Sequence, residues 1–339
     1  MENMIHSTPS HTSLPDCFVF PADQVLPASS AVVSLPVIDM SRSRDEVRRA
    51  ILNAGKELGF FQVINHGISE QAMQDMAAVG EEFFRLPAAD KVELCSEDVT
   101  KGTQLFSGTT YETGGERYWR DCLRFAYDFP VGNCTKDWPD KPHRLLEVVE
   151  NFTLLTRGLA MELLRLLCEG MGLPLDYFEG HLGGGYVTLD INHYPACPNP
   201  SITLGLPPHC DRDLMAVLLP GQVPGLEVAY NGDWIKVQPV SRAFVVNFGQ
   251  QLEVVTNGTL KSVEHRVMTN SALARTSVAM FIAPTEDCFI GPAAEFVSEE
   301  NPPCYHTLRF RDFKRIYNVV KLGSSLNLRT NLRKVQKET

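Results

Sequence analysis

The most constraining feature of this sequence is the segment 186–284, where short β-rich runs alternate with turn signals and no helical period intervenes. Asn231-Gly232, between the runs 226–230 and 234–237, predicts a tight β-hairpin, and Asn257-Gly258 predicts a second one. Several short strands at this spacing are typical of a barrel or of a jelly roll made of two sheets. We therefore expect a β-barrel or jelly-roll core here.

Helical patterns precede and follow this region. Ser43 and Glu46 form a capping-box signal, and apolar residues at helical spacing continue to residue 58. Ser69 starts a second periodic segment that ends before Pro87, and a long one covers 145–168. Short strands are predicted over 32–38 and 60–64, and a last helix over 305–317. The predicted fold class is α+β, with helices flanking the β core.

The same patterns divide the chain into four regions. Residues 1–30 are predicted to be loosely ordered, 31–182 to form an N-terminal helical region, 183–290 the β core, and 291–339 a C-terminal helix and tail. A chain of 339 residues is long enough to bury a sizeable core without disulfides or structural metals.

Charge and cysteine content argue against several function classes. Lys and Arg total 31 against 41 Asp and Glu, so the net charge is −10, and neither nucleic acid nor an anionic membrane is expected as a partner. No apolar run approaches the ~20 residues of a bilayer span, and no secretion signal is indicated. Nine irregularly spaced cysteines without a C-x-x-C favour reduced thiols. These features predict a cytoplasmic protein.

His209-Cys210-Asp211 is the first feature that suggests a metal site. Residues i and i+2 of a strand point to the same face, so His209 and Asp211 would enter one cavity while Cys210 points away. His265 lies in a second β-rich run. Two His and one carboxylate on one side of an ion leave its other side open, as in non-haem Fe(II) oxygenases, whereas structural zinc sites are closed. The pattern predicts an Fe(II) site.

Arg275 and Ser277 share a strand face shortly after His265. A guanidinium fork and a hydroxyl suit the far carboxylate of a dicarboxylate, held in a bidentate manner. A lone Arg usually forms a surface or interface ion pair, but the position of Arg275 in register with the three metal-ligand candidates favours a binding role.

Taken together, these features resemble the plant iron(II)/2-oxoglutarate-dependent dioxygenase superfamily. The order His209-x-Asp211, His265, Arg275-x-Ser277 matches the family's pattern. Further similar segments are 59–67, 83–87, 192–198, 225–228, 245–249 and 262–267. The resemblance extends from about residue 35 to residue 284, which is most of the chain.

The resemblance implies a double-stranded β-helix (jelly-roll) core with flanking α-helices. It implies 2-oxoglutarate and O₂ as cosubstrates, with ascorbate as reductant. It assigns three Fe(II) ligands, His209, Asp211 and His265. It also assigns four residues to the 2-oxoglutarate site, with Arg275 and Ser277 on the C5 carboxylate: Arg275, Ser277, Tyr194 and Asn192.

The sequence departs from the usual family pattern at three positions. Gln250 stands where many relatives carry Asp, and we assign it no role. His193 replaces a Tyr, which is expected to alter packing near the cosubstrate, and Cys210 stands where Thr is common.

Other segments resemble, within this superfamily, the grass enzymes of phytosiderophore synthesis, which hydroxylate an amino-polycarboxylate at an unactivated carbon. These segments are 207–212, 248–258, 270–277 and 316–328. A substrate rich in carboxylates requires cations, and three candidates are Arg120, Arg124 and Arg212. Family position adds four residues to the expected substrate pocket, with Asp190 accepting from a substrate ammonium: Asp190, Phe125, Phe281 and Ala283.

Three alternatives remain open from the sequence. A flavonoid, phenolic, alkaloid or hormone hydroxylase of the same superfamily would share these motifs but would have an apolar, aromatic pocket. A relative that does not use 2-oxoglutarate, such as an ethylene-forming oxidase, also carries Arg-x-Ser. A non-catalytic binding protein would retain only the barrel. We expect a small-molecule substrate and a monomer.

Overall fold

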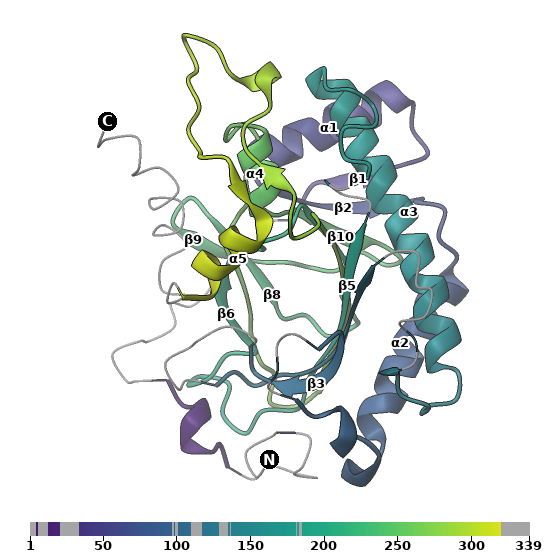
Figure 1. Cartoon of the computed structure of the whole chain (residues 1–339). Coiled ribbons are helices and arrows are strands. Elements are labelled where there is room, and N and C mark those ends of the chain that lie inside the picture. Colours follow the sequence, from purple (N-terminus) through teal and green to yellow (C-terminus); the bar gives the residue numbers. More distant parts are fainter. Residues whose placement is uncertain are drawn as a thin grey trace.

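The computed structural model describes residues 5, 13–20, 34–96, 98, 101–109, 117–128, 135, 137–180, 182 and 185–319. Two β-sheets face each other and helices cover the outer side of the larger one, which is a jelly-roll arrangement (Figure 1). The larger, eight-stranded sheet has the order β1-β2-β10-β7-β12-β5-β4-β3, and the smaller, four-stranded sheet has the order β6-β11-β8-β9. The predicted α+β fold class with a jelly-roll core is confirmed.

The strands of the larger sheet are β1 (Val37–Asp39), β2 (Phe60–Ile64), β3 (Thr103–Ser107), β4 (Asp121–Asp128), β5 (Tyr186–Tyr194), β7 (Met215–Leu219), β10 (Phe244–Phe248) and β12 (Arg275–Ala283). Those of the smaller sheet are β6 (Leu206–His209), β8 (Leu226–Tyr230), β9 (Asp233–Lys236) and β11 (His265–Val267). A separate short pair is formed by β13 (Phe289–Ile290) and β14 (Leu308–Arg309). The helices are α1 (Arg44–Glu57), α2 (Glu70–Arg85), α3 (Leu145–Met171), α4 (Gln250–Val255) and α5 (Phe310–Val319).

The first two helices begin where their capping residues predict. At α1 the Ser43 side chain accepts from the backbone of Glu46, and the Glu46 side chain accepts from the backbone of Ser43, which completes the predicted capping box. At α2 the Ser69 hydroxyl accepts from the backbone N–H of Ala72. These bonds satisfy backbone donors that a helix N-terminus otherwise leaves unpaired.

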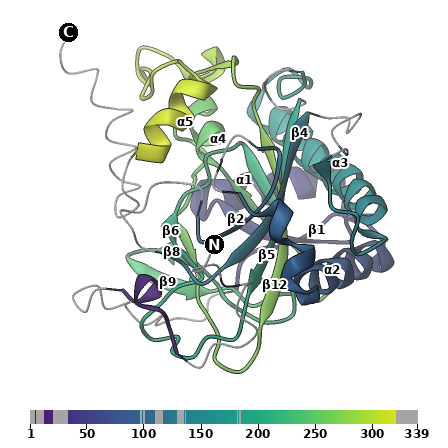
Figure 2. The same cartoon turned by 60° about the horizontal axis from the view of Figure 1, so that its bottom comes forward.

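The long helix α3 explains how the larger sheet is covered. It is buried along much of its length, packs against α1 and α2, and contacts β7 and β12. Figure 2 shows α2 and α3 side by side at the right of the molecule. Gly172, at φ 73°, ends α3 in the left-handed conformation that glycine adopts without strain. The main hydrophobic core therefore lies between these helices and the larger sheet. No helix in the described ranges is both long and apolar enough to cross a bilayer.

Two turn predictions have opposite outcomes. Asn231 and Gly232, at φ 51° and 88°, join β8 to β9, so the first hairpin is confirmed. Asn257 and Gly258 also have positive φ, but they follow α4 instead of joining two strands. The second hairpin prediction is wrong because the same left-handed Asn-Gly geometry also ends helices. The helix α4 itself was not predicted.

Strands of the predicted N-terminal region extend the sheet of the β core. β1 and β2 pair beside β10, and β4 pairs with β5, so no break in the sheet occurs at the predicted boundary near residue 182. β3 and β4 lie in the segment 91–141, where no strand was predicted.

Both chain ends differ in part from expectation. Within the segment expected to be loosely ordered, Ile5 and Phe18 are buried with Trp119, whose ring meets that of Phe18 edge to face at 5.2 Å. Most of that segment lies outside the described residues.

The final helix is confirmed as α5, although it begins at Phe310. The tail after residue 319 also lies outside the described ranges.

Candidate metal centre and active site

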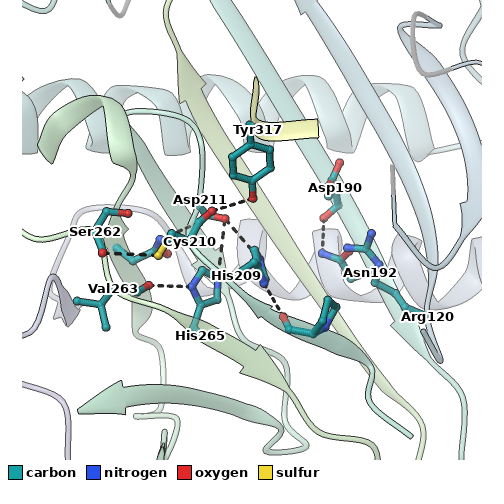
Figure 3. Close-up of polar contacts among 12 residues, drawn as sticks. Arg120, Asp190, Asn192, His209, Cys210, Asp211, Ser262, Val263, His265 and Tyr317 are labelled. Atoms are coloured by element: carbon teal, nitrogen blue, oxygen red, sulfur yellow. Dashed lines mark hydrogen bonds and ion pairs between the residues drawn. The ribbon is translucent and has the colours of Figure 1, made fainter. Parts of the chain in front are cut away.

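Three predicted metal ligands meet in the cavity between the two sheets. His209 ends β6 and His265 begins β11, where the two residues are direct cross-strand partners. Asp211 follows in the turn after β6, so it is this turn, and not strand alternation, that brings its carboxylate back toward the imidazoles. Oδ1 of Asp211 lies 3.6 Å from Nε2 of His209 and 3.8 Å from Nε2 of His265 (Figure 3). One donor atom from each residue lies within 4.8 Å of the others.

The two imidazoles are oriented by main-chain carbonyls. Nδ1 of His209 lies 2.8 Å from the carbonyl oxygen of Pro207, and Nδ1 of His265 lies 3.3 Å from that of Val263. A carbonyl only accepts, so each Nδ1 carries the proton and each Nε2 directs its lone pair at Asp211. Burial and the neighbouring His265 lower the pKa of His209, which keeps its imidazole neutral near pH 7. Both rings are therefore ready to bind a cation.

The turn that carries Asp211 forms backbone hydrogen bonds with the start of α4. The backbone N–H of Gln250 donates to the Asp211 carbonyl at 2.8 Å, and that of Gln251 donates to the Asp213 carbonyl at 3.2 Å. A Cβ on Gly249 would collide with the Asp213 carbonyl, so glycine is required for this close approach. Cys210 points away from the metal-ligand candidates, as predicted, and its thiol donates to the Ser262 carbonyl.

The donor set fits Fe(II). Two imidazoles and a carboxylate oxygen are the composition of a facial triad. Within the described ranges, no further His, Cys, Asp or Glu joins this group, so the side facing the cavity stays open to other ligands.

Arg275 and Ser277 lie on the opposite wall, in the larger sheet. In β12 they pair directly with Tyr194 and Asn192 of β5, so all four predicted 2-oxoglutarate residues share one patch and line the cavity. The Arg275 guanidinium donates to the carbonyls of Val223 and Pro220 and to the Ser277 hydroxyl, and it lies 5.1 Å from the centre of the Tyr194 ring.

The environment of Arg275 fits an anion. Arg275 is only 4% exposed, and no acidic side chain in the described part of the chain forms an ion pair with it. A buried charge without a counter-ion is costly, and a carboxylate bound in the cavity would provide one. Arg275 and Ser277 therefore fit the predicted carboxylate of 2-oxoglutarate.

Arg120 and Arg124 both line the cavity, but their guanidinium groups form hydrogen bonds with other groups of the protein. Nη1 of Arg120 donates to Oδ1 of Asn192 at 2.9 Å, and the same guanidinium donates to the Gly108 carbonyl. Arg124 holds Asp190 through two hydrogen bonds of 2.7 Å. Burial alone would raise the pKa of the Asp190 carboxyl, but Arg124 outweighs it and the pKa lies below its ordinary value. Arg124 and Asp190 therefore bind each other within this wall.

Of the other residues expected to bind substrate, two line the cavity and two do not. Arg212 and Phe281 line it. Phe125 points to the opposite face of β4, where its ring packs 4.6 Å from that of Trp138, and Ala283 is buried in the core at the end of β12. The expectation that Phe125 and Ala283 line the pocket is wrong, because strand alternation and strand length place them elsewhere.

Several residues that line the cavity were not predicted as site residues, among them Phe60, Asn247 and Tyr317. Phe60 and Asn247 fall within the family-like segments 59–67 and 245–249, which provided a signal. Tyr317 lies on α5, and nothing in its local sequence indicates where that helix docks.

Comparisons with known proteins agree with this geometry. Residues 187–284 match the 2OG-Fe(II) oxygenase superfamily, and residues 35–145 match the N-terminal region described as non-haem dioxygenase in morphine synthesis. The chain is 68% identical to 2′-deoxymugineic-acid 2′-dioxygenase of Hordeum vulgare, over 100% of both chains. It is 60% identical to mugineic-acid 3-dioxygenase of Hordeum vulgare, over 99% of both.

A solved structure has the same architecture. The crystal structure of JOX2 in complex with 2OG, Fe and JA aligns with a TM-score of 0.84 and 32% identity, and the alignment covers 96% of each chain. Full-length identity to named dioxygenases and this shared fold lead to one conclusion. The chain belongs to the 2OG-Fe(II) oxygenase superfamily and is a 2-oxoglutarate-dependent dioxygenase.

Proposed function

We propose that this dioxygenase hydroxylates an unactivated carbon of 2′-deoxymugineic acid and forms mugineic acid in phytosiderophore biosynthesis. The observation that carries the proposal is the 68% identity to the barley 2′-deoxymugineic-acid 2′-dioxygenase over the full length of both chains. The alternative that the chain is a non-catalytic binding protein receives no support from the complete set of metal-binding and anion-binding side chains.

The roles of the site residues are part of this proposal. His209, Asp211 and His265 bind Fe(II), as their converging donors support. Arg275 and Ser277 bind the C5 carboxylate of 2-oxoglutarate. Tyr194 and Asn192, their partners on β5, lie beside it. Bound Fe(II) and 2-oxoglutarate would supply oxidative decarboxylation, in which one O₂ provides one oxygen atom to succinate, formed with CO₂, and the other to the hydroxylated substrate; ascorbate would act only outside this balance, as the reductant that keeps the iron as Fe(II). The protein orients the substrate and excludes water.

Arg212 and Phe281 form the substrate contacts of this proposal. Among the described residues, no acidic side chain forms an ion pair with Arg212, which lines the cavity beside the metal-ligand candidates. A guanidinium in this position suits a substrate carboxylate. Phe281 adds apolar surface on the opposite wall. The paired Arg124 and Asp190 shape the wall between them without offering a free charge.

A hydroxylase of flavonoids, phenolics, alkaloids or hormones is the alternative within the family. Flavanone 3-dioxygenase 2 of Oryza sativa is 35% identical over 92% of both chains. Such a substrate favours an apolar, aromatic pocket, whereas this cavity presents Arg212, which forms no ion pair with an acidic side chain among the described residues. This cation favours the amino-polycarboxylate.

The test is reconstitution of the purified chain with Fe(II) and 2-oxoglutarate without oxygen, followed by addition of O₂ and one substrate. 2′-Deoxymugineic acid, mugineic acid and a flavanone are compared by succinate release and by mass spectrometry and NMR of the product. We expect substrate-dependent succinate with 2′-deoxymugineic acid and a product hydroxylated at C2′. Hydroxylation at C3, the position named for the 60% identical relative, would overturn the assigned carbon. Turnover of the flavanone alone would overturn the substrate class.

The Arg212→Ala variant tests the pocket in the same assay. We expect its KM for 2′-deoxymugineic acid to rise about tenfold, while its KM for 2-oxoglutarate stays unchanged. An unchanged KM for the substrate would remove Arg212 from the proposal.

We also propose that the protein is cytoplasmic and monomeric. Cell fractionation would test the compartment, and light scattering would test the oligomeric state.

A further inference from the structure

The last helix of the described chain is firmly docked beside the cavity. Phe310 and Phe313 of α5 are buried in the main core. Lys314 pairs with Glu286 and Arg311 with Asp287, both in the segment between β12 and β13. Figure 1 shows α5 next to α4, at the same end of the molecule. These contacts therefore fix the position of the last turn of α5, which lies beside the cavity.

Tyr317, in that turn, contacts the segment that carries His209 and Asp211. Its hydroxyl donates to the carbonyl oxygen of Cys210 at 2.8 Å, and its ring lines the cavity (Figure 3). Cys210 lies between His209 and Asp211, just beyond the end of β6. Tyr317 therefore gives this buried carbonyl a hydrogen-bond donor from a helix that is distant in the sequence.

Cys210 also connects the two chain segments that carry the metal-ligand candidates. Its thiol donates to the Ser262 carbonyl, at an S···O distance of 3.7 Å, in the segment that leads to His265. The backbone N–H of Ser262 donates in turn to the buried Glu253 of α4 at 2.8 Å. Displacement of Cys210 would therefore disturb His209 and Asp211 directly and the His265 segment indirectly.

We propose that Tyr317 is a positioning residue for the metal centre: its hydroxyl fixes the carbonyl of Cys210, and with it the directions in which His209 and Asp211 present their donor atoms. The inference rests on the metal ligands assigned under the proposed function. It gives α5, which contributes no metal ligand, a defined part in metal binding.

The test uses Tyr317→Phe, which keeps the ring and removes only the donor. Fe(II) itself is the probe, titrated without oxygen, substrate or 2-oxoglutarate, and the melting temperature of the metal-free protein is measured in parallel. Loss of one neutral hydrogen bond that acts through the backbone is expected to weaken Fe(II) binding about fivefold. Arg315→Ala is the matched control, because Arg315 lies on the same helix with its side chain 79% exposed. We expect this control to bind Fe(II) like the wild type.

The outcomes separate this inference from the proposed function. If the wild type fails to bind Fe(II), the assigned metal site and the inference both fail. If the wild type binds and Tyr317→Phe binds equally well, only the inference fails. Equal weakening in Arg315→Ala would also overturn it, because the effect would then belong to the helix as a whole.

The Tyr317→Ala variant provides a second measurement. It removes the cavity wall as well as the hydroxyl, so both variants are expected to weaken Fe(II) binding, but only Tyr317→Ala is expected to raise the KM for the organic substrate. Unchanged Fe(II) affinity in Tyr317→Ala would contradict the positioning role even if the KM rises.

Discussion

Asn247 and Asp211 join the two sheets at the metal site, because Nδ2 of Asn247 in β10 donates to Oδ2 of Asp211 at 2.7 Å. The other carboxylate oxygen, Oδ1, faces the Nε2 atoms of His209 and His265. Both Asn247 and Asp211 are buried. The amide therefore occupies one oxygen with a neutral hydrogen bond and leaves the other for a cation, which favours a carboxylate that binds metal through one oxygen.

The first prediction concerns this amide. Asn247→Ala should weaken Fe(II) binding by about 10- to 100-fold, because partners that orient a metal ligand typically contribute that much. Anaerobic Fe(II) titration measures the loss. Asn199→Ala, which removes an amide from an exposed turn, is the control and should bind normally. Normal Fe(II) affinity in Asn247→Ala would show that Asp211 is held without the amide.

The second prediction concerns the buried cation on the opposite wall. Arg275→Lys keeps the charge but cannot reproduce the fork that reaches Val223, Pro220 and Ser277. We expect the KM for 2-oxoglutarate to rise about 10- to 100-fold, as for the loss of a charged hydrogen bond. Fe(II) affinity measured without 2-oxoglutarate should not change, and this serves as the internal control. A parallel loss of Fe(II) affinity would instead indicate a general disturbance of the site.

The third prediction separates packing from binding in the arginine-rich wall. Arg124→Ala leaves the carboxylate of Asp190 buried without its partner, and breaking a buried ion pair in this way costs about 3–5 kcal/mol. The free energy of unfolding, measured with urea, should fall accordingly. Arg242→Ala breaks the exposed pair with Glu70 and should change stability by less than about 0.5 kcal/mol. Near-wild-type stability in Arg124→Ala would contradict the structural role of this pair.

The sequence could predict much of this site because its signals are local. The order of His209, Asp211, His265 and Arg275 lies in short motifs, and the capping box at Ser43 fixes the start of α1 through residues three positions apart. Such signals depend on neighbours in the chain. The capping signal survives folding because helix capping is a local rule, and Arg275 and Ser277 share a face of β12 through strand alternation. His209 and Asp211 meet for a different reason, because the turn after β6 brings them together.

What the sequence could not predict depends on contacts between distant segments. Nothing near Tyr317 indicates that its hydroxyl will meet Cys210, 107 positions away. Arg124 and Asp190 line the cavity, but nothing in the sequence indicates that β4 and β5 pair so that the two residues form an ion pair with each other. Phe125 faces the core because β4, which was not predicted at all, fixes its alternation. The docking of α5 decided the first of these outcomes, and pairing between strands decided the other two.

The fourth prediction concerns His193, whose position is usually Tyr in the family that the chain resembles. Its ring stacks on Phe84 of α2 at 4.7 Å, on the face of β5 away from the cavity, and Nδ1 lies 2.9 Å from the Thr276 hydroxyl. Burial lowers its pKa from 6.5 to about 4, although Asp121 acts in the opposite direction. In this environment the neutral imidazole is strongly favoured over the charged one.

This shift makes stability depend on pH with a defined sign. Between pH 6.5 and about 4 the unfolded chain binds a proton at His193 and the folded chain does not, so stability falls as pH drops through this range. After discounting for the partial exposure of the ring, the loss is about 2 kcal/mol. His193→Tyr removes this titration, so its unfolding free energy in urea, measured on metal-free protein, should fall less than that of the wild type. His143→Tyr, at an exposed position, should follow the wild type. If His193→Tyr loses as much stability as the wild type on acidification, burial of the neutral imidazole does not control this pH response.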